Sequence, residues 1–114
     1  MLPTLKCHHG YTVKPPSGAW YRIAGSAEAC ILNGLAVLEE TSGSLDRIER
    51  VIKLVGYVAS AKDFHEQPAV IDAASNLLVE IFGDAGTHAR SAVGVAQLPR
   101  GAPVEIELVV RLRI

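Results

Sequence analysis

Two side chains near the C-terminal end of the chain are of types that could do chemistry on a small acid. Arg90 carries a planar fork of N–H donors, which can hold a carboxylate through two parallel hydrogen bonds. Glu105 could hold or activate a water molecule if its surroundings keep it in the right protonation state. A site that binds a carboxylate and positions water is therefore one interpretation of these two residue types.

Both residues also have a purely structural interpretation. Arg90 could form an ion pair with Glu105 or Glu107 across a hairpin, and spacing alone favours that pairing. A glutamate that points outward from an alternating strand is usually just solvated. The residue types by themselves leave both interpretations open.

Histidine and cysteine residues give weaker signals. The Cys-His-His run at residues 7–9 lacks further ligands at metal-binding spacing, so we predict no metal site. His88 could titrate near neutrality and shuttle protons, although a rim residue is the simpler interpretation. We expect His88 to point to the opposite side of its strand from Arg90. Cys30 is expected to be a small core residue on the apolar face of a helix.

Hydrophobic periodicity predicts the elements that must position these residues. Apolar residues recur at helical spacing in two segments, and β-branched or alternating residues predict three strands. Ser26 is a plausible N-cap for the first helix, and the second helix opens with a proline. The predicted elements are a helix over 27–40, a strand over 45–58, a helix over 67–81, and strands over 89–97 and 103–114.

The order helix, strand, helix, strand, strand predicts an α+β domain, with a mixed sheet and both helices packed on one face. Residues 1–25 are less regular because prolines and glycines interrupt them, and only short strands over 11–14 and 19–23 are expected there. Gly56 is expected to mark a bulge or a close approach by another backbone. At 114 residues, we predict a single domain over 1–114.

Composition excludes several classes of function. The formal net charge of −1 offers no strong field for nucleic acid, and no stretch is long and apolar enough to cross a membrane. The two cysteines indicate neither a disulfide framework nor a zinc site. We therefore expect no nucleic-acid or membrane partner, no cofactor, and a cytoplasmic location.

Two segments carry a family resemblance. HARSAVGVAQLPRGAPVEIELVV, at 88–110, resembles the C-terminal signature of the RidA/YjgF family, and GSLDRIERVIKLVGYVASAKDFHEQPAVIDAASNLLVEIFG, at 43–83, is also similar. The resemblance covers residues 26–114. Residues 1–25 do not match the two strands with which family members normally begin, so this segment is atypical for the family.

The resemblance implies a chorismate-mutase-like fold, assembled as a homotrimer with clefts between subunits. It also implies hydrolysis of reactive enamines and imines of the 2-aminoacrylate type to a 2-oxo acid and ammonia. By motif alignment, Arg90 would bind the substrate carboxylate and Glu105 would help to position the water. The cysteine that many members carry two residues after the arginine is Ala92 here.

Two other functions remain in view. A non-catalytic trimeric protein that binds small carboxylates or has a regulatory role is the alternative, and it is favoured by Ala92 and by the atypical start. Some family members are also called L-PSP endoribonucleases or translation initiation inhibitors. The nearly neutral charge of this chain argues against a role on RNA.

Overall fold

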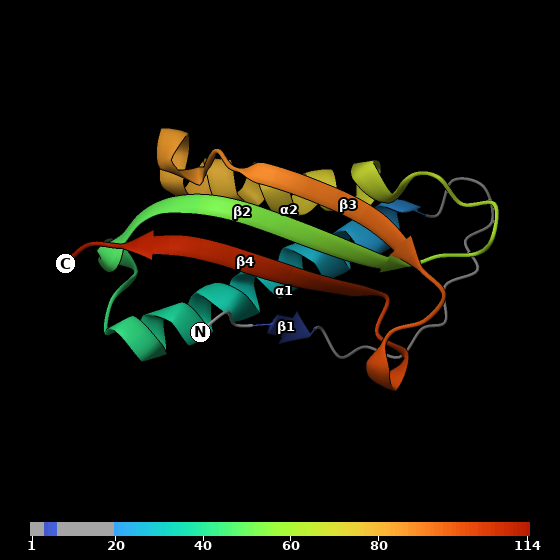
Figure 1. The fold of residues 1–114 in the computed structure, drawn as a ribbon, viewed down its shortest axis with the longest axis horizontal. Coiled ribbons are helices and arrows are strands. Elements are labelled where there is room, and N and C mark those ends of the chain that lie inside the picture. Colours follow the sequence, from blue (N-terminus) through green and yellow to red (C-terminus); the bar gives the residue numbers. More distant parts are fainter. Residues whose placement is uncertain (1–3, 7–19) are drawn as a thin grey trace.

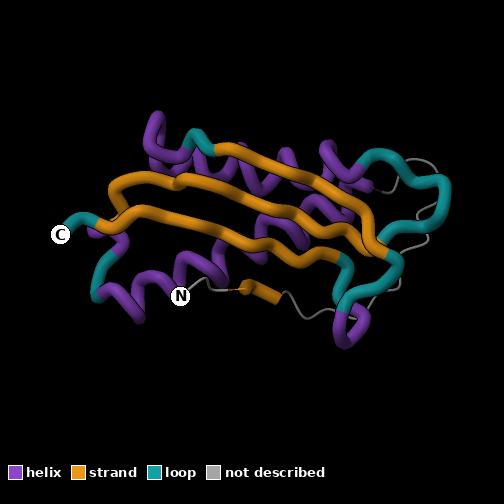
Figure 2. The backbone as a smooth tube through the Cα atoms, in the orientation of Figure 1, coloured by secondary structure: helices purple, strands orange, loops and turns teal. Residues whose placement is uncertain are grey.

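A computed structural model describes residues 4–6 and 20–114, with side chains described from residue 23 onward. A four-stranded sheet carries two helices on one face (Figures 1 and 2). The predicted α+β class and the placement of both helices on one side are confirmed. The elements are β1 (Thr4–Lys6), α1 (Trp20–Ser42), β2 (Ile48–Ala59), α2 (Gln67–Phe82), β3 (Ala89–Val95) and β4 (Val104–Leu112).

The helix α1 begins earlier than the sequence pattern predicted. Ser26 lies inside α1 and is not its N-cap, and residues 20–23, expected as part of a strand, are helical. The buried stripe explains the difference, because Ile23 lies one turn before Ala27 and is only 4% exposed. Burying that extra turn outweighs the helix-breaking preference of the exposed Gly25.

The second helix and the strands match their predicted ranges to within a few residues at each end. A left-handed Gly83 ends α2, with φ 59°, and its N–H donates to the carbonyl of Val79. A short 3₁₀ turn, η2 (Gly83–Gly86), then leads toward β3. The predicted strand over 11–14 and the run at residues 7–9 lie outside the described residues.

The sheet order β1-β4-β2-β3 corrects one expectation about the last two strands. β3 and β4 do not form a hairpin, because β2 lies between them, parallel to β3 and antiparallel to β4. The turn at Pro99–Gly101 therefore lies within the connection that passes the end of β2 and leads into β4 (Figure 1). β3 is an edge strand of the described sheet.

The core lies between the sheet and the two helices. It is aliphatic and contains no buried charged or polar side chain among the described residues. Gly56 sits in regular register opposite Ile106, and the close approach there comes from a side chain. A Cβ at Gly56 would lie 2.4 Å from Cδ1 of Ile71. The fully buried large side chains are Ile31, Leu54, Ile71, Leu78, Ile106, Leu108, Val51, Val58, Val70, Val104 and Cys30.

Candidate functional site

Arg90 lies near the start of the edge strand β3 and points toward α2. Its register partner on β2 is Leu54, which is fully buried beneath the helices, so both side chains share the helix-covered face of the sheet. The Arg90 side chain is 26% exposed. It reaches out of the strand far enough to contact α2, and it is therefore not a freely solvated surface arginine.

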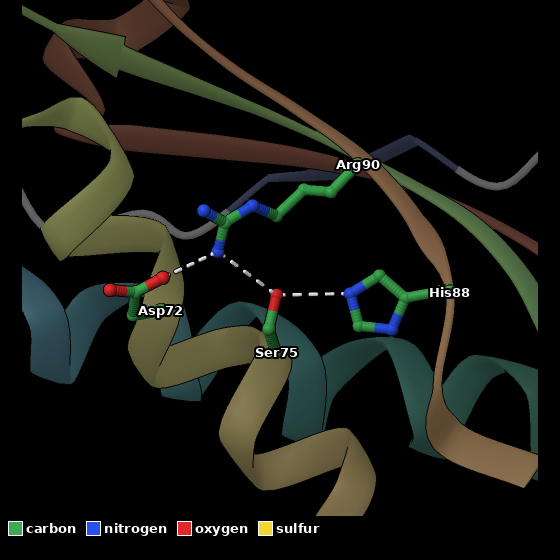
Figure 3. A network of polar contacts seen from close by, with 4 residues as sticks. All are labelled: Asp72, Ser75, His88 and Arg90. Carbon is green, nitrogen blue, oxygen red and sulfur yellow. Dashed lines mark hydrogen bonds and ion pairs between the residues drawn. The ribbon is translucent and has the colours of Figure 1, made fainter. Parts of the chain in front are cut away.

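Two residues of α2 hold the guanidinium of Arg90 (Figure 3). Arg90 Nη1 donates to Asp72 Oδ1 at 2.7 Å and to Ser75 Oγ at 3.4 Å. The predicted structural pairing of Arg90 with Glu105 or Glu107 is wrong, because β2 separates β3 from β4. The partner is instead Asp72 on α2, the helix that precedes β3 in the chain.

The other two guanidinium nitrogens of Arg90, Nε and Nη2, have no hydrogen-bond partner among the described residues. All of the hydrogen bonds made by Arg90 there come from Nη1, and Nε and Nη2 make none. Nε and Nη2 form one edge of the planar group, the edge that binds a carboxylate side-on. In Figure 3 this edge points away from Ser75. Within the part of the chain that the structure describes, the guanidinium is thus held on one side and has no partner on the other.

His88 extends the same network. Its Nε2 lies 2.9 Å from Ser75 Oγ, and its Nδ1 lies 2.6 Å from the carbonyl oxygen of Gly86. The expectation that His88 points away from the Arg90 side was wrong, because residues two apart in extended chain share a face. Both residues face α2 and meet at Ser75 (Figure 3).

The sequence interpretation missed Asp72 and Ser75. They lie three residues apart on α2, at the margin of the apolar stripe that contains Ile71, Ala74 and Leu78. Residues three apart share one side of a helix, which gave a weak signal that these two polar side chains act together. Only the packing of β3 beside α2 shows that Arg90 is their partner.

Glu105 lies on the other face of the sheet. Its register partner is Tyr57, on the face that the helices leave uncovered. Burial raises the pKa of Tyr57, as do the charge of Glu107, a hydrogen bond with that residue, and the charge of Glu105. Glu105 therefore belongs to a small group of acids around one tyrosine, separated from Arg90 by the thickness of the sheet.

Surface hollows lie along α2 and at its N-terminal end. One, of about 450 Å³, lies between α1 and α2 and is lined by Asp72 together with Glu28 and Glu80. Another, of about 550 Å³, lies at the carboxyl ends of β2 and β3, beside Gln67 and Gly94. Arg90 lines neither of them. No helix in the described ranges is long and apolar enough to span a membrane.

Comparison with known proteins agrees with the fold and with the sequence signature. The crystal structure of protein Atu1372 from Agrobacterium tumefaciens, of unknown function, is 45% identical, with a TM-score of 0.80 over 82% of this chain and 61% of that one. The YjgF gene product of Escherichia coli, at 23% identity, shares the fold with a TM-score of 0.59, over 98% of this chain and 78% of that one.

A curated relative and a family model complete the assignment. Protein TCP17 of Trypanosoma cruzi is 47% identical over 88 residues, which is 76% of this chain. The chain spans only 55% of the length of TCP17. Residues 2–110 match the family model described as "YjgF/chorismate_mutase-like, putative endoribonuclease". The chain therefore belongs to the YjgF/chorismate-mutase-like family.

Proposed function

We propose that this protein hydrolyses small reactive enamines and imines that carry a carboxylate, such as 2-aminoacrylate, to a 2-oxo acid and ammonia. The observation that supports this proposal is the orientation of Arg90. Asp72 and Ser75 accept hydrogen bonds from Nη1, so among the described residues the edge formed by Nε and Nη2 is left for a carboxylate. A held guanidinium fixes both the position and the direction of a small acid.

The reaction asks little of the protein beyond orientation. 2-Aminoacrylate tautomerises to 2-iminopropanoate, water adds to the C=N carbon, and the adduct expels ammonia to leave pyruvate. In this proposal Arg90 binds the carboxylate and Glu105 positions the attacking water. No covalent intermediate, metal or cofactor takes part.

Assembly is a necessary part of the proposal. Arg90 and Glu105 face opposite sides of one sheet, so one protomer cannot aim both at a single small molecule. We propose a homotrimer in which Arg90 of one copy and Glu105 of another border the same cleft, in the cytoplasm. The family membership supports this arrangement, and the mass of the protein in solution tests it.

The test of activity is the release of pyruvate from enzymatically generated 2-aminoacrylate, compared with the spontaneous rate. We expect the protein to accelerate release and R90A to bring it back to the spontaneous rate. Equal rates for the wild type and R90A would remove Arg90 from the mechanism.

Ala92 favours a second function, the binding of small carboxylates without catalysis. Ala92 follows Arg90 on the same face of β3 and brings no thiol to that side of the strand. Saturable binding of pyruvate without any turnover of 2-aminoacrylate would indicate a protein that binds or senses small carboxylates. Binding to RNA is a poorer candidate at a net charge of −1.

A further inference from the structure

Ser75 and His88 form a hydrogen-bonded pair beside Arg90, and the proposed reaction assigns His88 no part. Ser75 Oγ lies 2.9 Å from His88 Nε2 and 3.4 Å from Arg90 Nη1. Both side chains are partly buried between α2 and β3. The position of this pair next to Arg90 raises the question of what Ser75 and His88 do for that side chain.

The carbonyl of Gly86 determines the direction of the hydrogen bonds. A carbonyl oxygen only accepts, so His88 Nδ1 carries a hydrogen and donates it to Gly86 across 2.6 Å. In the neutral form of His88, a ring that donates from Nδ1 accepts at Nε2, and in that form the Ser75 hydroxyl donates to it. The Ser75 oxygen is then left to accept from Arg90 Nη1.

The backbone beneath His88 is itself held in place. A Cβ at Gly86 would lie 2.2 Å from the carbonyl oxygen of Leu78, so η2 packs directly on the backbone of α2. Gly86 is buried, although the 3₁₀ turn that contains it is short. The acceptor that orients His88 is thus fixed to the helix that carries Ser75 and Asp72.

We infer that Ser75 and His88 are positioning residues for the proposed carboxylate site. This inference rests on the proposed function. The hydrogen bond that Arg90 Nη1 donates to Asp72 fixes how far Arg90 extends, yet a single bond leaves the guanidinium free to turn about it. The longer contact with Ser75 removes that rotation, and His88 keeps the Ser75 lone pair directed at Nη1. The edge of Nε and Nη2 is thereby held in one orientation.

A serine that donates to an oriented histidine also matches the geometry of a nucleophile with its base. Two observations favour positioning. Ser75 lines neither the hollow between α1 and α2 nor the one at the carboxyl ends of β2 and β3, and its oxygen already accepts from Arg90. A serine-directed fluorophosphonate probe separates the two roles, because a nucleophile would be labelled at Ser75.

The experiment measures pyruvate binding by calorimetry in the full chain, together with the ¹⁵N signals of His88 and Arg90. For the wild type we expect the Nδ1–H tautomer of His88 and a resolved Arg90 Nε–H signal. S75A should weaken pyruvate binding about three- to tenfold, as expected for the loss of one hydrogen bond, and broaden the Arg90 signal. S75T keeps the hydroxyl and should stay close to the wild type.

Ser91 provides a matched control. It is the next residue of the same strand, its register partner is Val55, and it points to the uncovered face of the sheet. S91A should leave pyruvate binding and the ¹⁵N signals unchanged. Wild-type affinity and an unchanged Arg90 signal in S75A, or labelling of Ser75, would overturn the positioning role. A protein that binds pyruvate in this way without turnover would refute the proposed reaction alone.

Discussion

Arg90 and Glu105 project from opposite faces of one sheet. Their register partners on the central strand β2 are Leu54 and Tyr57, three residues apart, and side chains at an odd spacing on a strand point to opposite faces. Leu54 is buried under the helices, whereas Tyr57 lies on the uncovered face. Two copies of the chain are needed before these two side chains can act on one small ligand.

Mixing two inactive variants tests this relationship. If each site combines Arg90 of one copy with Glu105 of another, co-assembled R90A and E105Q chains recover about a quarter of the sites in a random one-to-one mixture. Each variant alone should be inactive in the 2-aminoacrylate assay. A mixture that stays inactive after subunit exchange is confirmed by mass would contradict a shared site.

Replacing Arg90 with lysine tests the need for a planar fork. R90K keeps the positive charge but loses the two parallel donors of the Nε and Nη2 edge, so we expect pyruvate affinity to fall at least about tenfold. Calorimetry measures the change. R111K is the matched control, because Arg111 is also an ion-paired arginine on a strand, donating to Glu49 at 2.7 Å. Equal losses of pyruvate affinity in R90K and R111K would mean that replacing an arginine with lysine weakens binding without any specific role for Arg90.

The ion pair between Arg90 and Asp72 should matter more for orientation than for stability. The two side chains are 26% and 57% exposed, and ion pairs this accessible to water contribute about 0–1 kcal/mol. We expect D72N to lower the free energy of unfolding in urea by less than about 1 kcal/mol. A loss of several kcal/mol would mean that the pair is a structural element of the fold.

The contact between Gly56 and Ile71 should be the point where the sheet tolerates least change. A Cβ at Gly56 would lie 2.4 Å from Cδ1 and 2.5 Å from Cγ1 of Ile71, so G56A should destabilise the fold by about 1–3 kcal/mol. Truncating the opposing side chain makes room for the new methyl group. The double variant G56A/I71A should therefore lose less than the sum of the single variants in urea unfolding.

Tyr57 should make stability depend on alkaline pH. Burial and the nearby Glu107 raise its pKa above the ordinary value of 10.0, so the folded protein holds this proton more tightly than the unfolded chain does. The resulting stabilisation is complete below pH 10.0 and is lost as the pH rises through the folded-state pKa. Ultraviolet difference titration should show one late tyrosine that is absent in Y57F.

Variants of the neighbouring acids identify the cause of that shift. E107Q should move the late titration toward 10.0, because Glu107 contributes more to the raised pKa of Tyr57 than Glu105 does. E105Q should have a smaller effect, since Glu105 acts on Tyr57 only through its charge. An unchanged titration in E107Q would leave burial and the charge of Glu105 as the causes of the raised pKa.

The sequence by itself determined the elements and the family. The apolar stripe of α2, the alternation of β4 and the signature around Arg90 are local patterns, which can be recognised without knowing how the elements pack together. The start of α1 was missed because the sequence interpretation relied on such local patterns. Gly25 and Ser26 suggested a boundary, and burial of Ile23 in the core overrode it.

Only the tertiary structure decided which side chains meet. Adjacent position in the chain suggested that β3 and β4 pair, but strand order depends on how the whole sheet packs, and β2 lies between them. That order gives Arg90 the partners Asp72 and Ser75 on α2, 18 and 15 residues away in the chain. Contacts at such separations are set by packing between elements, which no local pattern encodes.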